Sequence, residues 1–163
     1  SEMCIRDRGK VILFKTALTG ELYDLLSSNS VLIQEKVSDL DFDFDAFVQG
    51  ADFSLSSATD SFAHGLFSVR SKQLFEGFTT KQAHAYLSGI LIGNDVRAAK
   101  HATEWALSQL SSIAIIGPTH LNQCFAKALS LCHVKTTLWN VTDATLAGFN
   151  VVYQQGIPLP HEE

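Results

Sequence analysis

Cysteine is scarce in this chain of 163 residues, and its three cysteines form neither a CxxC pair nor a disulfide framework. A reducing cytoplasm is therefore the expected compartment. No basic cluster exceeds two or three residues and the net charge is -5, so neither nucleic acid nor an anionic membrane surface is an expected partner. The longest strongly apolar stretch, around Leu87 to Ile92, is far too short to span a bilayer, and no secretory signal is recognisable before the first expected strand.

Several sequence motifs that are typical of nucleotide binding, zinc binding or nucleophilic catalysis are also absent. The chain has no GxxxxGK[ST] loop, no GxGxxG fingerprint, no HExxH zinc motif and no GxSxG nucleophile elbow. An acidic run suggests a calcium loop, but the positions where an EF-hand needs Gly and Glu hold Phe44 and Gly50. A solvated loop with a helix N-cap at Asp43 or Asp45 is the better interpretation of that run, which comprises Asp39, Asp41, Asp43 and Asp45.

What is present alternates between strand and helix. The pattern predicts a strand over Val11–Leu18, a short buried strand over Ile113–Ile116 and a further strand over Val134–Trp139. The last two are separated by one helix, which implies a parallel crossover and an α/β fold. The 46% hydrophobic content allows one globular domain with a sizeable core. Three helices are expected to begin with a threonine N-cap, at Thr19, Thr119 and Thr142.

The clearest helix starts at Thr79, where Gln82 completes a capping box, and its apolar pattern continues to about Leu110. Gly89 and Gly93 lie four residues apart within it. Each costs roughly 1 kcal/mol relative to Ala in a helix interior. The close approach of another backbone would explain that cost.

Among the features that residue spacing predicts, the turn formed by Gly117, Pro118 and Thr119 indicates a ligand site most directly. A small-residue turn between a buried strand and a helix N-terminus is where α/β proteins bind nucleotides and other ligands, although such turns also serve as plain connections. His120 lies in the first turn of the following helix, where it is either a site residue or a surface residue. Arg70 stands in an apolar stretch and needs a partner, which an anionic ligand or a neighbouring carboxylate would supply equally well.

Several segments together resemble the 2-dehydro-3-deoxygalactonokinase family, with order and spacing that agree from about residue 10 to 155. The more specific ones are a Thr-Gly-Glu-Leu helix start and a Leu-Ser-Gly-x-Leu-Ile-Gly stretch. The segments are Phe14-Lys-Thr-Ala-Leu-Thr-Gly-Glu-Leu22, Phe47-Val-Gln-Gly50, Leu66-Phe-Ser-Val-Arg70, Tyr86-Leu-Ser-Gly-Ile-Leu-Ile-Gly93, Ile115-Ile-Gly117 followed by Leu121 and Phe125-Ala-Lys-Ala-Leu129, and Asp143-Ala-Thr-Leu-Ala-Gly148.

The resemblance implies an actin-type kinase with two ribonuclease-H-like lobes around a cleft. It implies phosphate transfer from MgATP to the 6-hydroxyl of 2-dehydro-3-deoxy-D-galactonate in galactonate breakdown. The turn at Gly117, Pro118 and Thr119 would hold the adenosine, and Pro118 departs from the family's looser pattern there. The resemblance further places four residues near the cleft as substrate-side candidates: Thr19, Gly20, Glu21 and Arg70. It implies no metal ligand in this chain and leaves a homo-oligomer open.

The same resemblance shows what these residues do not include. The family's two phosphate loops, Asp-x-Gly-Ser/Thr and Pro-Gly-Thr-His, do not occur, and the catalytic group is expected in the N-terminal lobe. We therefore expect residues 9–158 to be a truncated C-terminal lobe with inserted helices, which lacks its first two strands and the whole N-terminal lobe and is inactive alone. Residues 1–8 are expected to be a non-native or disordered tail, and residues 159–163 a second tail. The strand over Val11–Leu18 should pair differently or leave an exposed edge. The rival hypotheses are a non-catalytic α/β interaction domain and an actin-fold sugar kinase of other specificity.

Overall fold

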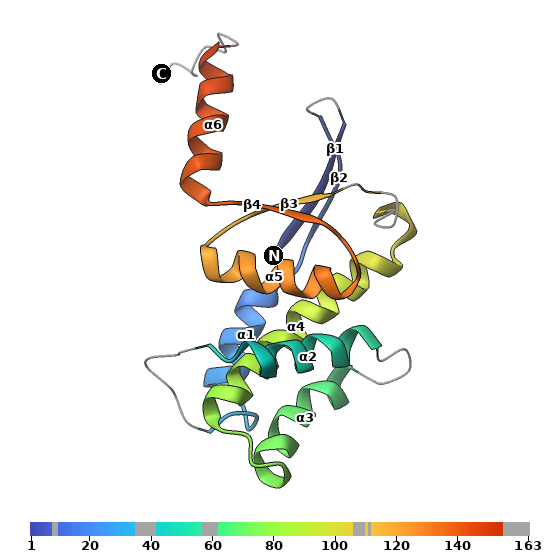
Figure 1. Ribbon diagram of the computed structural model, residues 1–163, viewed down its shortest axis with the longest axis vertical. Helices are drawn as coiled ribbons and strands as arrows, with labels where there is room; N and C mark the ends of the chain where they lie inside the picture. Colours follow the sequence, from blue (N-terminus) through green and yellow to red (C-terminus); the bar gives the residue numbers. More distant parts are fainter. Residues whose placement is uncertain (8–9, 35–41, 57–61, 106–109, 111, 155–163) are drawn as a thin grey trace, which may run out of the picture.

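The computed structural model describes residues 1–7, 10–34, 42–56, 62–105, 110 and 112–154. Its α/β architecture places two small sheets on one side of a layer of helices (Figure 1). The strands are β1 (Glu2–Asp7), β2 (Lys10–Thr16), β3 (Ile113–Ile116) and β4 (Thr136–Trp139). The helices are α1 (Thr19–Ser28), α2 (Phe44–Ser56), α3 (Phe62–Phe75), α4 (Thr80–His101), α5 (Thr119–Leu131) and α6 (Val141–Gln154), with a 3-10 turn at Thr103–Trp105.

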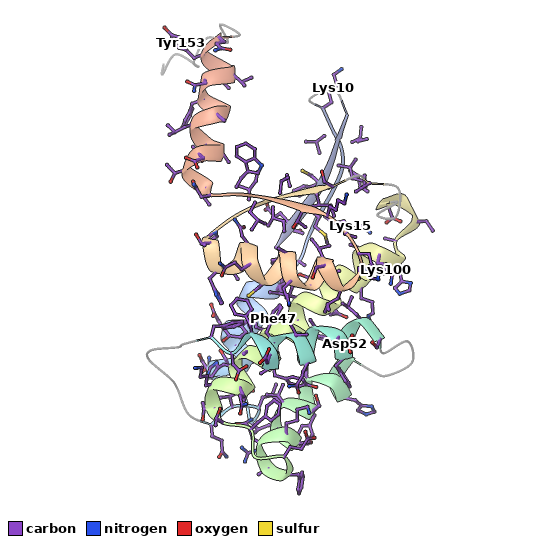
Figure 2. The ribbon with its side chains drawn as sticks, viewed as in Figure 1. Lys10, Lys15, Phe47, Asp52, Lys100 and Tyr153 are labelled. Carbon is purple, nitrogen blue, oxygen red and sulfur yellow. The ribbon has the colours of Figure 1, made fainter. Side chains whose placement is uncertain are left out.

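The core is centred on the crossing of α2 and α4. Phe47, Leu87 and Ile90 are completely or almost completely buried there, and Phe47 lies inside the helical layer (Figure 2). A Cβ on Gly89 would collide with the Phe47 carbonyl oxygen and lie 2.8 Å from the Ala51 nitrogen. On Gly93 a Cβ would lie 2.8 Å from the Ala51 carbonyl oxygen. The predicted close approach of another backbone is therefore confirmed, and its partner is α2.

Helix α4 begins as predicted. The Thr79 hydroxyl accepts a hydrogen bond from the Gln82 backbone N–H at 3.2 Å, and the Gln82 side chain accepts one from the Thr79 N–H at 3.0 Å. The helix ends at His101 rather than near Leu110, and a 3-10 turn follows it. The Asp43 cap of α2 is also confirmed, because its carboxylate accepts from the Ala46 N–H at 2.9 Å. Asp39 and Asp41 lie outside the described residues.

The sheet topology separates into two pairs. β3 and β4 are parallel, with Ile113 opposite Thr136 and Ile116 opposite Trp139, which confirms the predicted crossover. β1 and β2 are antiparallel and form a sheet of their own. Residues 2–7 therefore form a strand, in contrast to the tail expected over residues 1–8. The strand over Val11–Leu18 was expected to pair differently or leave an exposed edge, and among the described strands β2 pairs with β1 rather than with β3 or β4.

Two apolar regions of the chain are exposed. Helix α6 buries none of its described residues and extends away from the helical layer, with Tyr153 exposed near its far end (Figures 1 and 2). Phe75, at the end of α3, is 83% exposed. The cap of α6 also differs from the expected Thr142. The Asn140 side chain accepts a hydrogen bond from the Asp143 N–H at 2.8 Å, and the helix starts at Val141, two residues before the start that a Thr142 cap would give.

The close contact between α2 and α4 predicts that one added methyl group lowers the stability of the fold. Gly89→Ala should lower the free energy of unfolding by about 1–3 kcal/mol, because the helices must move apart to admit the new Cβ. Gly148→Ala in α6 is the matched control, since a Cβ there meets nothing within 4 Å. That control should be neutral or stabilising by up to about 1 kcal/mol. Urea unfolding followed by circular dichroism measures both; equal midpoints for the two variants would contradict the tight crossing.

Candidate functional site

The turn after β3 lies at the carboxyl ends of two parallel strands. The Gly117 N–H donates to the Trp139 carbonyl oxygen at 3.3 Å and so ties the end of β3 to the end of β4. Ligands of open α/β sheets bind at this edge, outside the carboxyl ends of the strands. The structure therefore places Gly117, Pro118 and Thr119 together where a ligand site is expected.

The N-terminus of α5 has no side-chain cap, which corrects the prediction that Thr119 caps it. Pro118 occupies the N-cap position with φ -59° and ψ 143°, and Thr119 is the first helical residue. A proline at this position has neither a hydroxyl nor an N–H to offer. The N–H groups of the first turn therefore keep their hydrogen-bonding capacity for a ligand, at the positive end of the helix dipole.

Asn122 lies directly behind this turn, and the sequence prediction did not include it. Its side chain is buried, with 4% exposed, and its Nδ2 donates to the Trp139 carbonyl oxygen at 2.9 Å. Its Oδ1 is buried and has no hydrogen-bond partner among the described residues. A Cβ on Gly117 would lie 3.0 Å from that oxygen. The signal in the sequence was a polar residue on the apolar face of α5, three residues before Phe125 and seven before Leu129.

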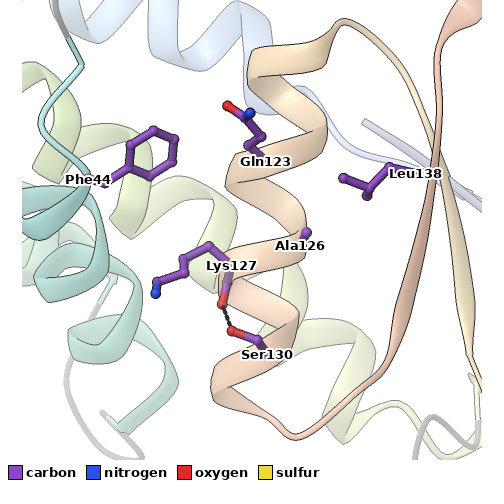
Figure 3. A pocket seen from close by; sticks show the side chains of 6 residues that line it. All are labelled: Phe44, Gln123, Ala126, Lys127, Ser130 and Leu138. Carbon is purple, nitrogen blue, oxygen red and sulfur yellow. Dashed lines mark hydrogen bonds between the residues drawn. The ribbon is translucent and has the colours of Figure 1, made fainter.

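An aromatic group flanks the turn on the α2 side. The His120 ring meets Phe42 edge-on, with centroids 4.3 Å apart, and lies 6.2 Å from the Phe44 ring. Phe44 also lines an open hollow of about 430 Å³ along α5, between α2 and β4 (Figure 3). The hollow's other lining residues are Gln123, Ala126, Lys127, Ser130 and Leu138. His120 is thus an exposed residue beside the turn, and one side of its ring packs against Phe42.

The candidates at the start of α1 form a second location. Thr19 begins the helix and Leu18 occupies the cap position without a side-chain bond, so Thr19 is not the predicted N-cap. Its hydroxyl instead donates to the carboxylate of Asp95, a residue of α4 that is 8% exposed. Gly20 has open space around it and Glu21 is exposed. Asp95 was missed because nothing in the α4 pattern distinguishes a buried carboxylate from a solvent-facing one.

Arg70 stands apart from both locations, on the half-buried part of α3. Among the described residues it has no hydrogen bond and no salt bridge, so the neighbouring carboxylate that the sequence left open is not found there. In the described part of the chain, no hydrogen bond or ion pair links Arg70, the start of α1 and the Gly117 turn to one another.

The buried thiol near the turn is not a nucleophile. Burial raises the pKa of Cys124 to about 12, and its sulfur lies 3.7 Å from the His120 Nε2. Burial, followed by the nearby Asp24 and Cys124, raises the pKa of Tyr23, whose hydroxyl lies 3.1 Å from the His84 Nδ1. Both groups therefore stay protonated near neutral pH, as a structural core requires.

Within the described ranges, no three His, Cys, Asp or Glu side chains converge as metal ligands do. No described helix is long and apolar enough to cross a membrane. Fold and turn together define an α/β protein whose candidate ligand site lies at the carboxyl ends of β3 and β4.

Comparison with known proteins narrows this class to a family. The chain belongs to the 2-keto-3-deoxy-galactonokinase family, whose family model matches residues 4–152. DgoK1 of Rhizobium meliloti (strain 1021), assigned as a 2-dehydro-3-deoxygalactonokinase, is 26% identical over 156 residues, which is 90% of this chain and 47% of that protein. A crystal structure from Sinorhizobium meliloti, given the same assignment, superposes with a TM-score of 0.78 at 24% identity, over 99% of this chain and 51% of that one. The chain thus spans about half the length of these relatives.

Burial of the Cys124 thiol predicts selective protection from alkylation. At pH 8 iodoacetamide should modify the exposed Cys4 and leave Cys124 unmodified, because the thiolate is the reactive form and the site excludes solvent. After unfolding in urea all three cysteines should react. Mass spectrometry of the digested protein distinguishes the sites; rapid modification of Cys124 in the folded chain would disprove the burial.

The Thr19 hydrogen bond to a buried carboxylate predicts a cost for its removal. Thr19→Val should destabilise the fold by about 1.5–3 kcal/mol, because a hydrogen bond to a charged group is lost at nearly constant shape. Thr16→Val is the control, since Thr16 is exposed at the end of β2. Urea unfolding compares the two variants; an equal stability would show that Asp95 does not depend on Thr19.

Proposed function

We propose that the protein containing this chain transfers a phosphoryl group from MgATP to the 6-hydroxyl of 2-dehydro-3-deoxy-D-galactonate, in the cytoplasm. In this proposal the chain is most of the C-terminal, ribonuclease-H-like lobe of an actin-like kinase, and Gly117, Pro118 and Thr119 hold the adenosine. The observation that carries it is the uncapped N-terminus of α5 at the carboxyl ends of β3 and β4, in a chain of a kinase family.

The chain's own chemistry in this reaction is binding and orientation. Phosphoryl transfer depends on positioning the reactants and on neutralising the phosphate charge with Mg²⁺. The two phosphate loops expected of the family do not occur in the sequence, and the described residues offer no carboxylate cluster for Mg²⁺. We therefore assign no magnesium ligand to this chain and expect the chain alone to be inactive.

The sugar acid would meet the chain at two places. Arg70 is a half-buried cation without a salt bridge among the described residues, which suits it to the carboxylate of the substrate. Thr19, Gly20 and Glu21 form a helix start that Asp95 fixes, with open space at Gly20 for an approaching hydroxyl group. The rest of the protein would bring these two places and the nucleotide turn to face one cleft.

The main alternative is a non-catalytic interaction domain. The observation that favours it is the apolar surface left exposed on α6 and β4, where Trp139, Leu146 and Phe149 are each at least half exposed. A partner protein would cover such a surface, and so would the other half of a kinase. An assay of the whole protein separates the two.

The decisive test is the activity of the protein encoded by the complete reading frame. With MgATP and 2-dehydro-3-deoxy-D-galactonate it should release ADP in a coupled spectrophotometric assay, whereas the 163-residue chain should not. Arg70→Ala should raise the KM for the sugar acid at least about tenfold with little change in the KM for ATP, because one charged hydrogen-bonded contact is worth roughly 1.5–3 kcal/mol. Arg70→Lys, which keeps the charge, should recover part of the loss.

A complete protein that binds ATP but phosphorylates other sugars would correct the substrate alone. If the complete protein neither binds ATP nor consumes it, the kinase proposal is wrong and the interaction domain is favoured.

A further inference from the structure

The unpaired Oδ1 of Asn122 is a polar group that the fold itself does not explain. Asn122 is 4% exposed, and its amide nitrogen already serves the structure by donating to the Trp139 carbonyl oxygen at 2.9 Å. The oxygen of the same amide has no partner in the described part of the chain. A buried acceptor without a hydrogen bond costs about 1–3 kcal/mol. If Asn122 served only to hold α5 against β4, a side chain without this unpaired acceptor would give a more stable fold.

The position of this oxygen connects it to the turn. It faces the side of Gly117 where any other residue would carry its Cβ, at 3.0 Å from that point. Because residue 117 is a glycine, no side chain of its own lies between the turn and this oxygen. On the other side, Gly117 and Asn122 both donate to the Trp139 carbonyl oxygen, which fixes the amide orientation with its oxygen toward the turn.

The groups around the turn differ in hydrogen-bonding character: some are donors and one is an acceptor. The uncapped first turn of α5 presents N–H donors, which suit an anionic or acceptor group. Asn122 presents an acceptor, which needs a donor. A nucleoside phosphate carries both kinds of group: phosphate oxygens that accept, and ribose hydroxyls and a base amine that donate.

We propose that Asn122 is a further nucleotide-binding residue, whose Oδ1 accepts a hydrogen bond from a donor group of the nucleoside held at the Gly117 turn. This inference rests on the proposed nucleotide-binding function and adds to it a polar contact that selects among nucleosides. The donor is a ribose hydroxyl or the exocyclic amine of adenine, and ligands that lack one donor at a time distinguish these sources.

The test uses the ¹⁵N-labelled chain and four nucleosides: adenosine, 2′-deoxyadenosine, 3′-deoxyadenosine and purine riboside, which lacks the 6-amino group. At millimolar concentrations, adenosine should shift the backbone amide resonances of Gly117 and Thr119 and the side-chain amide of Asn122. One of the three analogues should bind about fivefold more weakly than adenosine, the loss expected for one neutral hydrogen bond. The analogue that loses affinity identifies the donor.

Asn122→Ala provides the second arm of the comparison. In this variant adenosine and the weaker analogue should bind with equal affinity, because the Asn122 amide oxygen that distinguishes them has been removed. Gln123→Ala, at the next and exposed position of α5, should keep the wild-type ratio. The ratios measured on the unchanged chain remain decisive if the Asn122 variant does not fold.

Two different failures are distinguishable. If adenosine shifts Gly117 and Thr119 while all four nucleosides bind alike and the Asn122 side chain does not respond, the role of Asn122 is refuted and the nucleotide site stands. If neither adenosine nor ATP shifts any resonance of the turn, the nucleotide-binding function itself is refuted for this chain, and the role of Asn122 with it.

Discussion

The backbone contact between α2 and α4 is the constraint on which the rest of the structure depends. At Gly50, Gly89 and Gly93 the two helices lie so close that a methyl group on either side would meet the main chain of the other. This proximity buries Phe47, Leu87 and Ile90 between them and makes the helical layer the best-packed part of the molecule. Three glycines in helix interiors weaken each helix alone, and only the dispersion and burial gained at the crossing offset that cost.

The candidate site depends on this crossing through α5. Cys124, Ala128 and Leu129 bury one face of α5 against the helical layer, while Asn122 ties the same helix to the end of β4. The turn at Gly117 is therefore held between a rigid layer and a small sheet. The packing of α5 against the helical layer therefore fixes the positions of the polar groups at the turn, and ligand sites generally require such support from the surrounding structure.

Sequence reasoning succeeded where one local rule decided the outcome. The capping box at Thr79 and the strand over Ile113–Ile116 were predictable, because each rests on a pattern within a few residues. The parallel crossover was predictable from the order strand, helix, strand. The threonine caps failed at three helices, since Leu18, Pro118 and Asn140 occupy the positions before the first helical residue. Asn122 and Asp95 could not be assigned from spacing. Their meaning comes from a carbonyl of β4 and a hydroxyl of α1, which lie far away in the sequence.

The contrast between the two sides of the molecule bears on how the site would work. The crossing of α2 and α4 is buried, whereas β2, β4 and α6 carry most of their apolar side chains on the surface, including Ile12, Trp139 and Phe149. The family relatives are about twice as long, so the remainder of such a protein has the size to cover these faces. Covering them would remove apolar surface from water at roughly 25 cal/mol per Å². Because β4 also supplies the Trp139 carbonyl oxygen that accepts from Asn122, contact between β4 and the rest of the protein would act directly on the geometry of the Gly117 turn. If the turn binds a nucleotide as proposed, nucleotide binding and the contact at β4 are energetically coupled, and each changes the affinity of the other by the same factor.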